Sequence, residues 1–155
     1  MIDSAGNPRP KSEWALTAIE RLFDVVRDEM GLSRTDYDIV GFSGGAQFVH
    51  RLVLFLPEAR FRRAVAASPG RYAFPSWSDK FPYGLAGSPI DRPGLAVAFS
   101  RQLVLLLGDR DVTDRARDDW ISGHVQHGSD PDTTLESHQN VGILYAGMAD
   151  ECHGR

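Results

Sequence analysis

Cysteine is almost absent from this chain, with Cys152 the only one among 155 residues. One thiol excludes an internal disulfide framework and a zinc site built from several cysteines. The sequence also lacks a P-loop, a dinucleotide-binding fingerprint and a zinc-ligand motif. We therefore expect no metal and no cofactor.

Long apolar runs and a strong charge of either sign are missing too. No run approaches the roughly 20 residues that span a bilayer, and residues 1–14 are too polar for a signal peptide. The expectation is a cytoplasmic protein without a membrane partner, although a chain lacking its true N-terminus would hide an export signal. A net charge of −4 gives no footprint for nucleic acid. The length and the 42% hydrophobic content suit one globular domain, 1–155.

The apolar pattern predicts alternating helices and strands. Ser12 can cap a helix that runs to about Met30, where apolar residues recur every four positions and Gly31 follows. The predicted strands are 37–42, 62–68 and 101–107, and the other predicted helices are 44–56 and 133–151. This order is typical of an α/β fold with a parallel sheet and flanking helices, whose active site lies at the carboxyl ends of the strands.

Ser43 lies at such a strand end, in the sequence Gly41-Phe42-Ser43-Gly44-Gly45. This matches G-x-S-x-G, in which a sharp strand-to-helix turn exposes the serine hydroxyl and small residues let strand and helix approach closely. The N–H group of Gly44 would begin the helix and could donate to an oxyanion. A glycine-rich turn that only packs helix on strand is the alternative.

The stretch 37–75, "YDIVGFSGGAQFVHRLVLFLPEARFRRAVAASPGRYAFP", resembles the α/β-hydrolase superfamily. It is most similar to bacterial hydrolases related to polyhydroxybutyrate depolymerases and esterases, and the segments "AQFVHR" and "FPYGL" share this similarity. The resemblance implies a three-layer sandwich and a serine nucleophile, an acid after a later strand and a histidine after the last strand. It implies hydrolysis of a small or polymeric carboxylic ester through a Ser43 acyl-enzyme.

The acid and the base are less well defined. The family pattern places the acid at Asp111, in the turn that follows strand 101–107, with Asp109 and Asp114 as competitors and a structural turn as the alternative. No histidine beyond Asp111 follows a convincing strand; the candidates are His124, His127, His138 and His153. His50 lies about two helical turns beyond Ser43, roughly 10 Å away. We therefore expect His50 to be structural.

Compared with the superfamily, the sequence lacks the strands before the nucleophile and the final strand with its histidine. This indicates a partial hydrolase domain whose isolated activity is low. A non-catalytic binding or interaction module with the same fold is the alternative. Unpaired sheet edges could also join a second copy into a homo-oligomer. The segment 69–100, rich in proline, glycine and aromatic residues, is expected to be a long loop or cap-like insertion, with its aromatic side chains in either a substrate pocket or the core.

Overall fold

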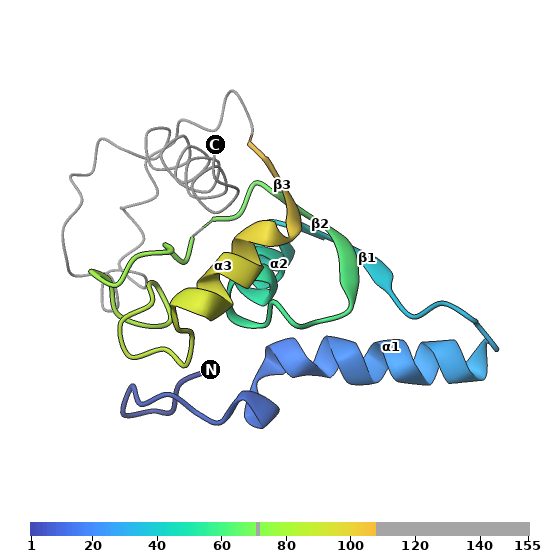
Figure 1. Cartoon of the computed structure of the whole chain (residues 1–155), viewed down its shortest axis with the longest axis horizontal. Coiled ribbons are helices and arrows are strands. Elements are labelled where there is room, and N and C mark those ends of the chain that lie inside the picture. The colour runs from blue at the N-terminus through green and yellow to red at the C-terminus, as the bar shows by residue number, and fades with distance from the viewer. Residues whose placement is uncertain (71, 108–155) are drawn as a thin grey trace.

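The computed structural model of the chain describes residues 1–70 and 72–107. Its strands form one parallel sheet in the order β1-β2-β3, with helices between them (Figure 1). The elements are the 3₁₀ helices η1 (Lys11–Glu13) and η2 (Ala15–Thr17), α1 (Ala18–Glu29), β1 (Tyr37–Phe42), α2 (Gly44–Phe55), β2 (Phe61–Ala67), α3 (Arg92–Ser100) and β3 (Gln102–Leu106). The predicted α/β fold with a parallel sheet is confirmed. The predicted helix 133–151 lies outside the described residues.

The two faces of the sheet differ in how they are covered. Ala64 and Ala66 of β2 are fully buried, and their small side chains let α2 pack closely on that face. On the opposite face, Val40 and Phe42 of β1 are each 72% exposed, and Val104 and Leu106, at the same level of β3, are exposed too. Within residues 1–70 and 72–107, therefore, the layer that would cover this second face in a three-layer sandwich is not seen.

In the described part of the chain, β1 and β3 each pair with β2 alone. Each outer strand therefore has one edge without a neighbour in residues 1–70 and 72–107. Pairing of a second copy at such an edge stays a prediction.

The first helix begins later than its sequence pattern predicts. Two 3₁₀ turns precede α1, and Ser12 lies in the first of them, so its predicted role as cap of a helix to Met30 is wrong. Trp14 interrupts the helix with an extended backbone (φ −73°, ψ 140°), because its indole is buried and donates to the Arg9 carbonyl at 2.8 Å. Tertiary burial of one side chain has overridden the local periodicity.

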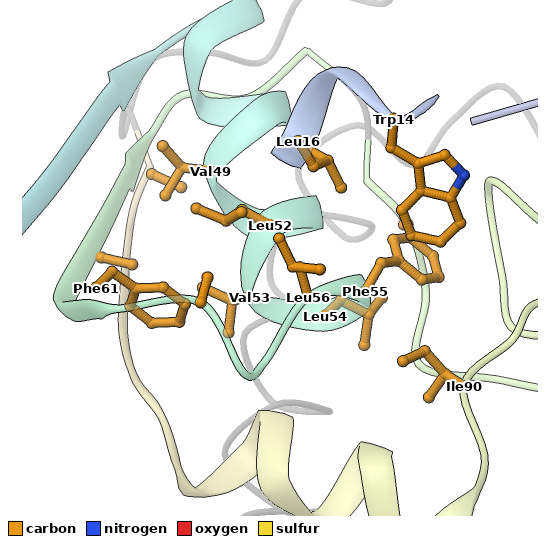
Figure 2. Packing of buried hydrophobic residues seen from close by; sticks show 14 of the residues in the cluster. Trp14, Leu16, Val49, Leu52, Val53, Leu54, Phe55, Leu56, Phe61 and Ile90 are labelled. Atoms are coloured by element: carbon orange, nitrogen blue, oxygen red, sulfur yellow. The ribbon is translucent and has the colours of Figure 1, made fainter. Parts of the chain in front are cut away.

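Aromatic rings join the N-terminal segment to the core beneath α2. Figure 2 shows Trp14 beside Phe55, and the two rings meet edge to face with centroids 6.4 Å apart. Phe81 stacks on Trp14 at 5.6 Å and meets Phe55 edge to face at 5.1 Å. Such aromatic pairs contribute about 0.5–1.5 kcal/mol each beyond the area that they bury.

The apolar stripe of α1 packs less than its pattern predicts. None of its residues is buried, and Leu22 and Val25 are more than half exposed. Ile19 packs against the core and Phe23 against Tyr37, and polar contacts add to this packing: Arg60 donates to Glu20 at 2.6 Å and to Asp24 at 2.7 Å. The hydroxyl of Tyr37 also donates to Glu20, at 2.6 Å.

The segment 69–100 is not loop throughout, which corrects the prediction. Its last nine residues form α3, where the carboxylate of Asp91 caps the helix by accepting from the Gly94 N–H group at 2.8 Å. Pro93 occupies the first turn, where its missing N–H group costs nothing. The Asp-x-Pro pattern was therefore a usable helix-start signal, obscured by the prolines and glycines around it.

His50 connects α2 to the segment that follows β2. Its Nε2 accepts a hydrogen bond from the Ala73 N–H group at 2.9 Å, so Nδ1 carries the proton and donates to the Ala46 carbonyl at 3.0 Å. The residue is fully buried and its ring lies against Tyr72. Burial, followed by the charge of Arg51, lowers the pKa of His50 to about 4.

This pKa predicts a loss of stability in mild acid. Because the unfolded chain binds a proton near pH 6.5 and the folded chain only near pH 4, the stabilisation is present above 6.5 and is lost as the pH falls toward 4. The free energy of unfolding should drop by about 2–3 kcal/mol over this window. Urea denaturation between pH 7.5 and 4.5 measures it, and His50→Gln should remove the greater part of the slope. Equal slopes in parent and variant would contradict this role of His50.

Candidate active site

Ser43 occupies the turn between β1 and α2, as its sequence position predicts. Its N–H group continues the sheet by donating to the Ala67 carbonyl at 3.0 Å, and its own carbonyl accepts from Gln47 in the first turn of α2 at 3.1 Å. The chain changes from strand to helix within this one residue. Its backbone dihedrals are φ 53° and ψ −114°, a conformation that costs a non-glycine residue on the order of 1–3 kcal/mol.

Gly41 permits this turn because the helix passes directly against it. A Cβ atom on Gly41 would lie 2.8 Å from the amide nitrogen of Ala46 and closer still to the carbonyl group of Gly45. The close approach thus requires glycine at position 41. At Gly44 and Gly45 an added Cβ would meet no atom of residues 1–70 and 72–107 within 4 Å. The steric need for a small residue is therefore found at Gly41, whereas for Gly45 it stays a prediction.

The hydroxyl of Ser43 is not used to stabilise the helix. Serine is a favoured N-cap because its oxygen accepts from the first amide groups, yet Ser43 is the N-cap of α2 and makes no such bond. Its Oγ has no hydrogen bond within residues 1–70 and 72–107. The hydroxyl of Ser43 is therefore not needed to stabilise the turn between β1 and α2.

Gly44 is the first residue of α2, directly after Ser43. The first N–H groups of a helix have no intrahelical acceptor, and the helix dipole adds positive potential at that end. A negatively charged oxygen formed at Ser43 would therefore find a donor in the predicted position. The oxyanion role of Gly44 stays a prediction.

The predicted acid and the histidine candidates fall outside the described residues. These are Asp111 with its competitors Asp109 and Asp114, and His124, His127, His138 and His153. His50 is excluded as the base, since backbone groups occupy both of its ring nitrogens.

In the described ranges, no group of three or more His, Cys, Asp or Glu side chains could hold a metal ion. No helix among those residues is long and apolar enough to cross a membrane.

A cavity of about 520 Å³ lies at the other end of the sheet. Its walls are the residues that precede or begin the three strands, including Asp36, Arg60 and Arg101. Ser43 follows the carboxyl end of β1, so this cavity is remote from it. Because catalytic groups of parallel sheets gather at the carboxyl ends, we do not assign the cavity to the active site.

The aromatic residues of 69–100 divide between core and surface. Tyr72 and Phe81 are buried, against His50 and Trp14 respectively. Trp77 is 39% exposed beneath the guanidinium of Arg92, and Tyr83 faces that of Arg51. The core alternative is thus correct for Tyr72 and Phe81.

Comparison with solved structures identifies the class of fold. The chain is similar to poly(aspartic acid) hydrolase-1 from Sphingomonas sp. KT-1, with a TM-score of 0.81 and 36% identity over 99% of this chain and 58% of that one. It is also similar to LpqC, a poly(3-hydroxybutyrate) depolymerase from Bordetella parapertussis, with a TM-score of 0.77 and 26% identity over 97% of this chain and 51% of that one. No protein-family model and no curated protein matches.

The chain therefore has an α/β-hydrolase-like fold and resembles the depolymerase-like hydrolases that its sequence suggested. It spans 58% of the length of the first neighbour and 51% of the second.

The two glycines of the motif provide a matched test of this geometry. Gly41→Ala should destabilise the fold by about 3 kcal/mol or more, because the methyl group meets backbone atoms that cannot move aside. Gly45→Ala should be neutral or stabilise by up to about 1 kcal/mol, since alanine favours the helix and its Cβ has open space. Thermal and urea unfolding measure both. Equal effects of the two substitutions would contradict the close approach at Gly41.

Proposed function

We propose that this chain carries the nucleophile of a serine hydrolase and that Ser43 is that nucleophile. The observation that carries the proposal is the backbone of Ser43: a non-glycine residue with φ 53° at the junction of β1 and α2, with its hydroxyl not used as a cap. Both solved neighbours are hydrolases, which supports the same class of reaction.

In this proposal, Ser43 Oγ attacks the carbonyl carbon of the substrate and transfers its proton to a base. The carbonyl oxygen becomes an oxyanion and accepts a hydrogen bond from the Gly44 N–H group. Collapse of this intermediate expels the alcohol or amine, which takes up the proton, and leaves an acyl group on Ser43. Water then attacks the acyl-enzyme, which releases the carboxylic acid and restores the serine. Asp111 stays the predicted acid that would orient the base.

The preferred substrate is a neutral carboxylic ester. LpqC is described as a depolymerase of poly(3-hydroxybutyrate), a polyester, and the other neighbour as a hydrolase of poly(aspartic acid), a polyanion joined by amide bonds. A chain with a net charge of −4 would repel a polyanion over its surface as a whole. Amide hydrolysis is the second candidate, because the neighbour with 36% identity has that substrate.

The predicted absence of a recognisable base sets the expected rate. Enzymes that lose a triad member retain only about 10³–10⁴-fold enhancement over water. We therefore expect chemical modification of Ser43 to be easier to detect in this chain than multiple turnovers.

The test combines a fluorophosphonate probe with p-nitrophenyl acetate and an oligomer of aspartate. The parent should be labelled, Ser43→Ala should not, and Ser78→Ala, a change at an exposed serine, should be labelled like the parent. Slow release of p-nitrophenol without cleavage of the oligomer would support the ester preference, and the reverse would favour the amide. A parent that is never labelled would overturn the assignment of Ser43 and favour a non-catalytic module.

A further inference from the structure

Ser68 stands beside Ser43 at the same edge of the sheet and shares its unusual backbone. These two serines are the non-glycine residues with positive φ in the described part of the chain, 53° at Ser43 and 47° at Ser68. Each is the first residue after its strand. Glycine would adopt such a conformation without steric cost.

The sheet register places the two serines next to each other. Phe42 of β1 pairs with Ala67 of β2, so the residues that follow them leave adjacent strands at the same level. The ladder of backbone hydrogen bonds continues one step further. The N–H group of Ser43 donates to the Ala67 carbonyl, and the N–H group of Ser68 donates to the Leu106 carbonyl at 2.7 Å. Adjacent strands lie about 4.8 Å apart, a separation that a single ester or amide group can bridge.

The chain around Ser68 is held firmly. Pro69, the next residue, is fully buried, and its ring disfavours compact backbone conformations at the residue before it. Ser68 itself is partly exposed, and its hydroxyl has no hydrogen bond among residues 1–70 and 72–107. The strain is thus maintained by surrounding structure, as at many functional sites.

From this placement we infer that Ser68 is a substrate-contacting residue of the site at Ser43. Its hydroxyl donates a hydrogen bond to the ester or amide group under attack, on the β2 side of the nucleophile. Ser68 forms no covalent bond and moves no proton in the reaction. The inference rests on the function proposed for Ser43.

Two substitutions separate this role from a purely structural one. Ser68→Ala removes the hydroxyl and keeps the strained backbone, whereas Ser68→Gly removes the hydroxyl and relieves the strain. Loss of one hydrogen bond to substrate corresponds to about a threefold to tenfold lower rate. Both variants should therefore show this decrease in the second-order rate constant of Ser43 labelling and of p-nitrophenyl acetate acylation. Ser68→Gly should at the same time raise the midpoint of thermal unfolding.

The outcomes are distinct. Slower acylation together with a higher unfolding midpoint in Ser68→Gly supports the inference, because a merely structural residue would not link lower reactivity to higher stability. Acylation rates equal to those of the parent and of Ser78→Ala overturn the inference and leave the role of Ser43 intact. A parent that does not react at all overturns the proposed function, and this inference with it.

Discussion

The contact between Gly41 and the first turn of α2 is the constraint on which the rest of the site depends. Strand and helix approach so closely there that no side chain fits at position 41. Because the chain must reverse from strand to helix within one residue, Ser43 takes a positive φ and becomes the N-cap of α2. The strain at Ser43 is therefore balanced by the packing of α2 on β1 and β2, where Ala64 and Ala66 are fully buried.

A second set of contacts holds α2 further along its length. His50, two turns into the helix, binds backbone groups of both α2 and the segment after β2, and the aromatic cluster of Trp14, Phe55 and Phe81 lies beyond it. Helix α2, which begins at Gly44, is thus fixed at both ends by buried contacts. Preorganisation of this kind allows a backbone N–H group to stabilise charge without rearranging during the reaction.

The strands, α2 and the position of Ser43 can be predicted from the sequence because their signals are local: short apolar runs, a motif and a proline stop. Features that depend on distant contacts cannot be predicted in this way. Trp14 breaks the first helix because its ring packs on Phe55 and Phe81, which lie 40–70 residues further along the chain. At Gly45 the motif suggests a steric need, yet no atom of the described residues lies within 4 Å of an added Cβ. The positive φ of Ser68 and its register beside Ser43 depend on tertiary structure. The local sequence "AASPG" therefore does not identify Ser68 as a candidate site residue.

The most direct test of the central claim is a crystal structure of the chain after reaction with a fluorophosphonate reagent, which loses fluoride when a serine oxygen bonds to its phosphorus. The account predicts phosphorus bonded to Ser43 Oγ, a positive φ retained at Ser43 and the phosphoryl oxygen about 3 Å from the Gly44 nitrogen. Phosphorus on another residue, or a phosphoryl oxygen that points away from the start of α2, would contradict it.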